Sequence, residues 1–216
     1  MKDLAAYIDH TILKPTTTEA EVRVLCTEAE QHQFAAVCVP PGYCSLAAEW
    51  LASTKVQVAT VIGFPFGYNC LTAKVAEIKQ AISDGADELD VVINQSALHN
   101  GHYNVLSQEI VACLQPIRLH RKIIKVILET GNLTEDQIIR CCTLYSQHKV
   151  DFVKTSTGYS EKGASIEAVQ LLRKHLPSTI SIKASGGIRT FESAQAMIAA
   201  GASRIGTSSG VKIVST

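Results

Sequence analysis

The chain has 216 residues, 46% of them hydrophobic, and its 20 lysine and arginine residues balance its 20 aspartate and glutamate residues. This composition suffices for a globular core, and the longest apolar runs are too short to cross a bilayer. Because there is no net positive charge, the composition argues against nucleic acid as the main partner, although it allows a local basic pocket.

The seven cysteines predict free thiols rather than a disulfide framework. Their number is odd, they are scattered, and no two have the CxxC spacing of a redox or zinc motif. The N-terminal segment lacks the uninterrupted apolar stretch of a signal peptide. We therefore expect a cytoplasmic protein that does not associate with a membrane.

Strand-like and helix-like stretches alternate along the chain. Short runs rich in β-branched residues predict strands at residues 7–9, 35–39, 56–62, 89–93, 123–128, 151–154, 180–183 and 204–206. Amphipathic stretches between them predict helices, for example at residues 19–32, 71–83, 135–147, 166–175 and 191–200. Thr134 and Thr190 stand where two of these helices should begin, and Gly85 and Gly201 stand where two should end.

Eight strands that alternate with helices predict a (β/α)8 TIM barrel. The sequence contains no linker, low-complexity tract or shift in composition. We therefore expect one domain over residues 1–216, with lean loops and a short N-terminal extension before the first strand. The alternative is a doubly wound open sheet, which the same alternation of elements would allow.

Charged residues occupy three of the predicted strands, close to the loops that follow. Lys154 precedes Thr-Ser-Thr-Gly, Lys183 precedes Ala-Ser-Gly-Gly, and Asp90 precedes Val-Val-Ile-Asn. Successive side chains of a strand point to opposite faces, and the polar face of these strands should point to the barrel axis. We expect Asp90, Lys154 and Lys183 to converge where active sites of this fold lie. Lys125, in the fifth predicted strand, is a further inward-facing candidate.

Such a cluster can perform amine chemistry. Two ammonium groups held close together cannot both stay charged without cost, so one of them is pushed toward the neutral amine. A neutral lysine can attack a carbonyl and form a Schiff base, and a nearby carboxylate can move protons through a water. The residues leave open whether Lys154 or Lys125 is the nucleophile. They also allow a purely structural ion pair between Asp90 and one lysine.

The loops after the last two predicted strands suit an anion. Ser185-Gly186-Gly187 follows the seventh strand, and a Gly-Thr-Ser-Ser-Gly segment that contains Ser208 and Ser209 follows the eighth. In TIM barrels these loops, with a short helix that begins here near Ser208, commonly hold a phosphate. Arg189 could add charge, or it could form an ion pair on the surface. The seven histidines form no HxH or HExxH pattern, so we expect no metal site.

Seven segments of the chain together resemble deoxyribose-phosphate aldolases. The segments are IDHTILKP (8–15), GFPFG (63–67), DELDVVIN (87–94), KVILETG (125–131), VKTSTG (153–158), IKASGGIR (182–189) and RIGTSSG (204–210). They occur in order from residue 8 to the C-terminus. The resemblance implies a class I aldolase, a carbon–carbon lyase that needs no metal or organic cofactor. Its partners would be a small phosphorylated sugar and acetaldehyde, and it would associate as a homo-dimer or homo-tetramer.

The resemblance also implies roles for individual residues. Lys154 would form the Schiff base, Lys183 would favour the neutral form of that amine and relay protons, and Asp90 would be the general acid and base. Asp9 would belong to the polar network around the substrate hydroxyls. The phosphate would bind to Gly186, Gly187, Ser208 and Ser209.

The sequence departs from the family pattern in the loop after the sixth strand and at the C-terminus. The segment from Tyr159 to Gly163 replaces a smaller or more basic stretch, and the chain lacks the tyrosine-bearing C-terminal tail of some members. We expect both to affect how the phosphate is enclosed.

Two alternative functions remain. One is a class I aldolase for a different phosphorylated sugar, and the other is a barrel that binds a phosphorylated metabolite without catalysis.

Overall fold

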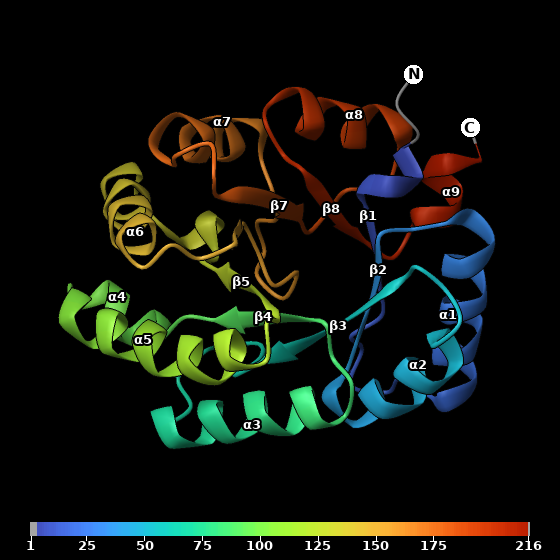
Figure 1. Cartoon of the computed structure of the whole chain (residues 1–216). Helices are drawn as coiled ribbons and strands as arrows, with labels where there is room; N and C mark the ends of the chain where they lie inside the picture. Colours follow the sequence, from blue (N-terminus) through green and yellow to red (C-terminus); the bar gives the residue numbers. More distant parts are fainter. Residues whose placement is uncertain (1–3, 216) are drawn as a thin grey trace.

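The computed structural model describes residues 4–215, in which eight parallel strands form a closed barrel. Each strand pairs with the next along the chain, and the ring is closed by β8 against β1, with Ile205 opposite Ile8. Figure 1 shows the strands at the centre and the helices around them. The predicted TIM barrel is confirmed, and the doubly wound open sheet is wrong because the two terminal strands pair with each other.

The strands lie within two residues of their predicted bounds. They are buried along almost their whole length, as expected for parallel strands covered by helices. The bounds are β1 (Ile8–Thr11), β2 (Ala36–Val39), β3 (Gln57–Ile62), β4 (Glu88–Val92), β5 (Ile123–Ile127), β6 (Phe152–Lys154), β7 (Ser181–Ser185) and β8 (Arg204–Thr207).

The five predicted helices are present with the same ends to within one residue. They are α1 (Glu19–His32), α3 (Leu71–Ser83), α6 (Glu135–Gln147), α7 (Ile166–His175) and α8 (Phe191–Ala199). Thr134 and Thr190 cap α6 and α8 as expected, each accepting a hydrogen bond from a backbone N–H of the first turn. Gly85 and Gly201 adopt positive φ angles of 93° and 118° where α3 and α8 end.

Further helices occupy stretches for which the sequence suggested no bounds. They are α2 (Cys44–Leu51), α4 (Gln95–His99), α5 (Tyr103–Leu119) and α9 (Gly210–Val214), together with the 3-10 turns η2 (Pro41–Tyr43) and η3 (Thr130–Asn132). The helix expected near Ser208 begins two residues later, as α9. Of the predicted N-terminal extension, residues 1–3 lie outside the described part, and the rest is the 3-10 helix η1 (Leu4–Tyr7), which contacts α9.

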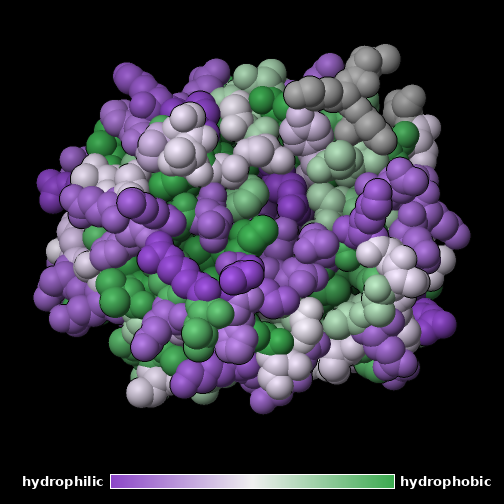
Figure 2. Space-filling model, in the orientation of Figure 1, coloured by the Kyte–Doolittle hydropathy of each residue, from purple (hydrophilic) through white to green (hydrophobic). Residues whose placement is uncertain are grey.

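The hydrophobic core lies between the barrel and its helices, where the outward-facing side chains of the strands meet the inner faces of the helices. On the face of the molecule seen in Figure 1, hydrophilic residues are widespread and hydrophobic ones form several separate areas (Figure 2). In residues 4–215 no helix is long and apolar enough to span a membrane. All seven cysteines are free, as predicted.

Candidate active site

The interior of the barrel is charged, and Asp90 on β4 stands at its centre. One carboxylate oxygen, Oδ1, lies 2.8 Å from Nζ of Lys125. The other, Oδ2, lies 2.8 Å from Nζ of Lys154 and 2.8 Å from Nζ of Lys183. Strand register explains the convergence, because Lys125 is the Cα partner of Asp90 and Lys183 is the Cα partner of Lys154. The structure thus brings together the three residues that the sequence placed on the barrel axis.

Two further carboxylates lie beside this cluster. Asp9 on β1 forms ion pairs with Lys183 and Arg204, and Glu88 on β4 accepts hydrogen bonds from Arg204 and lies 2.5 Å from Nζ of Lys125. Asp9, Glu88, Asp90, Lys125 and Lys183 are all completely buried. A buried side chain stays charged only when an opposite charge lies beside it, and here each carboxylate contacts at least one cation of the network.

The carboxylates keep the deeper lysines protonated. Burial alone would lower the pKa of Lys183, but the charges of Asp9 and Asp90 outweigh burial and raise that pKa above its usual value. The pKa of Lys125 is raised in the same way by Asp90, Asp9 and Glu88. Conversely, burial would raise the pKa of Asp90, but Lys125, Lys154 and Lys183 hold it well below its usual range. The expectation that neighbouring ammonium groups push one another toward the neutral amine therefore does not hold for Lys125 or Lys183, because the carboxylates outweigh that repulsion.

The network contains one cation more than it has carboxylates. Within the described residues, Asp9, Glu88 and Asp90 face Lys125, Lys154, Lys183 and Arg204. Loss of a proton from one lysine would make the network neutral. Lys154 differs from the other lysines of the network in two ways: its single carboxylate contact is Asp90, and its side chain also lines a cavity.

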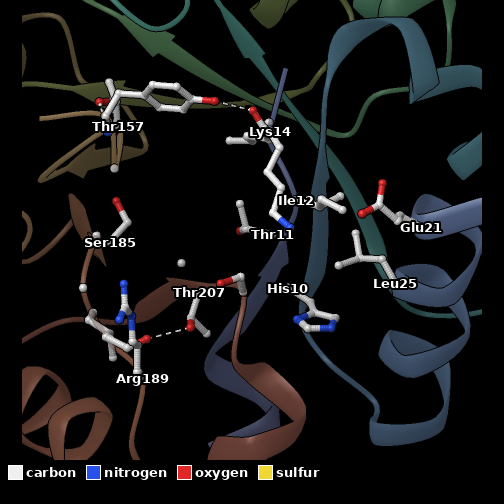
Figure 3. Close-up of a pocket in the computed structure, with 18 of the residues that line it drawn as sticks. His10, Thr11, Ile12, Lys14, Glu21, Leu25, Thr157, Ser185, Arg189 and Thr207 are labelled. Carbon is white, nitrogen blue, oxygen red and sulfur yellow. Dashed lines mark hydrogen bonds between the residues drawn. The ribbon is translucent and has the colours of Figure 1, made fainter. Parts of the chain in front are cut away.

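This cavity opens above the charged interior and has a volume of about 810 Å³, which is ample for a small metabolite. Lys154 lines it. Residues from the loops after β1, β6, β7 and β8 form its walls, together with one face of α1 (Figure 3). Lys125, Lys183, Asp90 and Asp9 are completely buried and do not line the cavity. Of the two lysines that the residue pattern left as candidates, Lys154 therefore lines the cavity and Lys125 does not.

Most of the predicted phosphate-binding residues lie on one wall of the cavity. Gly186, Gly187 and Ser208 line it, and Arg189 does so as well. Gly187 and Ser208 are exposed, and the two glycines have positive φ angles of 89° and 82°. Ser209 lies just outside this wall, where its N–H donates to the Thr207 hydroxyl over 2.9 Å.

Hydrogen bonds join the loop after β6 to the loop after β7. The hydroxyl of Ser185 donates to the carbonyl of Ser156 over 2.6 Å, and the Ser185 N–H donates to the Thr155 hydroxyl over 3.1 Å. Further along, the N–H of Ala164 donates to the Gly186 carbonyl over 3.0 Å. The residues that follow Lys154 in the chain are therefore fixed against the glycine pair on the neighbouring strand.

Glu129, after β5, holds the same loop from the other side. It is buried and has a left-handed backbone, with φ of 60°. Its carboxylate accepts hydrogen bonds from the N–H of Thr157, over 3.2 Å and 3.3 Å, and from the Thr157 hydroxyl. A non-glycine residue in this conformation costs free energy and indicates that its surroundings require it.

Sequence reasoning missed Glu88, Arg204 and Glu129. Glu88 could have been found, because it lies two residues before Asp90 and so shares its inward face. Arg204 opens β8 on the same face as Gly206, which lines the cavity. No sequence pattern indicates the role of Glu129. Its contacts depend on a left-handed backbone conformation, which glutamate seldom adopts and which its residue type therefore does not predict.

Among residues 4–215 no group of three histidine, cysteine, aspartate or glutamate side chains is arranged to hold a metal ion. His10 lies beside Asp9 in the sequence but faces away from the charged cluster. Its Nε2 is 2.7 Å from a carboxylate oxygen of Glu28 on α1.

Comparison with known proteins agrees with this geometry. Residues 4–216 match the model of the DeoC/LacD family aldolases. A deoxyribose-phosphate aldolase of Caldicellulosiruptor saccharolyticus is 49% identical over 215 residues, which cover 99% of this chain and 98% of that protein.

Solved structures agree in fold as well as in sequence. A candidate deoxyribose-phosphate aldolase from Coccidioides immitis superposes with a TM-score of 0.95 at 46% identity, covering 99% of this chain and 85% of the other. The tetrameric deoxyribose phosphate aldolase of Aeropyrum pernix superposes with a TM-score of 0.92 at 33% identity, covering 98% and 89%. The chain therefore belongs to the DeoC/LacD family of aldolases.

Proposed function

We propose that the protein is a deoxyribose-phosphate aldolase, which cleaves 2-deoxy-D-ribose 5-phosphate reversibly to D-glyceraldehyde 3-phosphate and acetaldehyde through a Schiff base on Lys154. The observation that carries the proposal is the position of Lys154. Lys154 lines a cavity large enough for the sugar, and its Nζ lies 2.8 Å from a carboxylate oxygen of Asp90, in a network with one cation more than it has carboxylates.

The reaction begins at the aldehyde carbon of the open-chain sugar. The amine of Lys154 adds to this carbon, and loss of water leaves an imine, which accepts electrons when protonated. Removal of the proton from the C3 hydroxyl then breaks the C2–C3 bond and releases D-glyceraldehyde 3-phosphate. The electron pair of that bond forms the enamine of acetaldehyde. Protonation at C2 and addition of water to the imine release acetaldehyde and restore the amine.

Asp90 and Lys183 are suited to move the protons. Oδ2 of Asp90 lies 2.8 Å from Nζ of Lys154, and Nζ of Lys183 lies 2.8 Å from the same oxygen. Because neither residue lines the cavity, we infer that Asp90 exchanges protons with the substrate through a bound water, with Lys183 as the neighbouring donor. Asp9 forms ion pairs with Lys183 and Arg204 and would act on the substrate hydroxyls through Lys183, since it does not line the cavity.

The phosphate would lie against the wall formed by Gly186, Gly187 and Ser208. Backbone N–H groups of glycine can approach phosphate oxygens closely, and a serine hydroxyl adds a donor. Arg189 supplies a positive charge at the same wall. Ser209 supports the loop through Thr207 and would act on the phosphate indirectly.

A barrel that only binds a phosphorylated metabolite has less support. Such a protein needs the glycine wall for the phosphate. It does not need the excess positive charge of the buried network, which lowers stability and is expected to be kept only where it serves catalysis.

We further infer a homo-oligomer, either a dimer or a tetramer, and a reducing compartment such as the cytoplasm. The related aldolase of Aeropyrum pernix is tetrameric, and the seven thiols of this chain are all unpaired with one another.

Borohydride trapping with acetaldehyde tests the proposed function. Reduction of the imine should leave one ethyl group on Lys154, found by peptide mapping with mass spectrometry. Cleavage of 2-deoxy-D-ribose 5-phosphate is followed in the same preparation. Folded protein that gives no adduct on any lysine and no cleavage would disprove the proposal.

Gly163→Ala should weaken phosphate binding. A Cβ at this position would lie 2.2 Å from the carbonyl oxygen of Gly186, so the glycine wall must move. We expect the KM for the phosphorylated sugar to rise about tenfold, with a loss of about 1–3 kcal/mol in stability from overpacking. Steady-state kinetics and urea unfolding measure the two effects.

Gly42→Ala is the matched control. No atom lies within 4 Å of the position that its Cβ would take, and Gly42 has no positive φ. Both parameters should stay at wild-type values there. Equal KM values for Gly163→Ala and the wild type would show that the Gly163–Gly186 contact does not shape the phosphate site.

A further inference from the structure

Tyr159 joins three loops at the mouth of the cavity. Its hydroxyl donates a hydrogen bond of 2.7 Å to the carbonyl of Leu13, in the loop after β1. Its ring meets Phe64, in the loop after β3, edge to face, with 5.3 Å between ring centroids. A residue that follows β6 thus fixes the backbone of a loop 146 positions earlier in the chain.

The same loop carries Lys14, whose backbone is held from both sides. Tyr159 binds the preceding carbonyl, and the carbonyl of Lys14 itself accepts from the N–H of Thr17 over 3.0 Å and from the Thr17 hydroxyl over 2.7 Å. Lys14 lines the cavity, and its side chain extends from the loop into the hollow (Figure 3).

Lys14 carries a charge that no ion pair in the described part of the protein neutralises. No carboxylate within residues 4–215 forms an ion pair with it. Glu21 also lines the cavity, but its Oε2 accepts hydrogen bonds from the Thr18 N–H, over 2.8 Å, and from the Thr18 hydroxyl, over 2.9 Å. The capping box of α1 therefore holds this carboxylate, and Lys14 interacts with it through charge without forming an ion pair.

Arg189 presents a second unneutralised cation from the opposite wall. It too forms no ion pair in the described part of the chain. Figure 3 shows Lys14 and Arg189 on different sides of the hollow, with the loops after β7 and β8 near Arg189. Two like charges that face a shared cavity repel each other, and an anion of charge −2 placed between them removes the repulsion.

We propose that Lys14 is a specificity-determining residue that makes the protein prefer phosphorylated over unphosphorylated sugars, and that Tyr159 is its positioning residue. The inference rests on the proposed function and extends the phosphate site from the glycine wall to the loop after β1. An unphosphorylated sugar leaves the two cations unpaired and gains nothing from Lys14.

The test compares kcat/KM for 2-deoxy-D-ribose 5-phosphate with kcat/KM for 2-deoxy-D-ribose. In Lys14→Gln the ratio of the two should fall about fivefold, the size expected when one exposed ion pair is lost. The change should appear in KM for the phosphorylated sugar and should shrink as salt is added. Lys79→Gln, an exposed lysine on α3 outside the cavity lining, removes the same charge and should keep the wild-type ratio.

Tyr159→Phe removes the hydroxyl and keeps the ring against Phe64. The ratio should fall in the same direction, by about twofold, because the loop loses one hydrogen bond but keeps its charge. If Tyr159 acts through Lys14, the double variant should show no larger change than Lys14→Gln alone.

Two results would overturn the inference alone: equal losses for both sugars in Lys14→Gln, or additive effects of Lys14→Gln and Tyr159→Phe. A folded wild-type protein that cleaves neither sugar would overturn the proposed function and this inference with it.

Discussion

Lys154→Met is expected to abolish cleavage of the sugar while leaving the protein as stable as the wild type, or slightly more stable. Loss of the covalent nucleophile should lower kcat by about 10⁴-fold or more. The effect on stability follows from the balance of charges in the buried network that Lys154 joins. Removing Lys154 leaves Lys125, Lys183 and Arg204 to balance Asp9, Glu88 and Asp90. Thermal or urea unfolding, together with single-turnover assays, measures both quantities.

Lys125→Met is the matched control, because it removes the same functional group from the same network. Lys125 is completely buried and lies within 3.5 Å of Asp9, 2.5 Å of Glu88 and 2.8 Å of Asp90. Breaking such pairs on one side should cost about 3–5 kcal/mol, because the carboxylates stay buried without their partner. If Lys154→Met loses as much stability as Lys125→Met, the buried excess of charge is not a feature kept for catalysis.

The fold was predictable because its signals are local and repeated. Strands read as short apolar runs, helices as amphipathic stretches, and Gly85 and Gly201 mark the turns between them. Closure of the barrel is not local. The pairing of Ile8 with Ile205 joins the two ends of the chain, and only the number of strands suggested it.

The candidate site likewise has features that the sequence predicts and features that it does not. Asp90, Lys154 and Lys183 were found because a charge inside a buried strand is conspicuous. The residue pattern alone left Lys154 and Lys125 as equal candidates, because both face the barrel axis. The family resemblance favoured Lys154, and of the two lysines only Lys154 lines the cavity. The bond from Tyr159 to Leu13 lies between two irregular loops, where no periodicity predicts which side chains meet.

Asp90→Asn is expected to damage both stability and turnover. Its carboxylate contacts three ammonium groups at 2.8 Å each, and the substitution leaves four cations facing two carboxylates. We expect a loss of about 3–5 kcal/mol, and at roughly 2–4 °C per kcal/mol for a protein of this size the melting temperature should fall by roughly 6–20 °C.

The pH dependence of this loss identifies its cause. The lysines lower the pKa of Asp90 in the folded protein, whereas an unfolded aspartate titrates near about 3.9. The stability from Asp90 is therefore present above about pH 4 and is lost as the pH falls further. The gap between the wild type and Asp90→Asn should be constant from pH 5 to 7 and should narrow below pH 4, by up to about 1.4 kcal/mol per pH unit. A gap that stays constant down to pH 3 would contradict the assignment.

The catalytic consequence of Asp90→Asn is separable from the structural one. A general acid and base of this kind contributes about 10²–10⁴-fold to the rate. If Asp90 moves the C2 proton, exchange of the acetaldehyde methyl protons with deuterium oxide should fall by about that factor, followed by NMR at a temperature where the variant is folded. The borohydride-trapped ethyl group on Lys154 should persist, because imine formation needs only the free amine. If adduct and exchange decline together, Asp90 only holds the lysines in place, and the proton must be moved by another group in contact with Lys154.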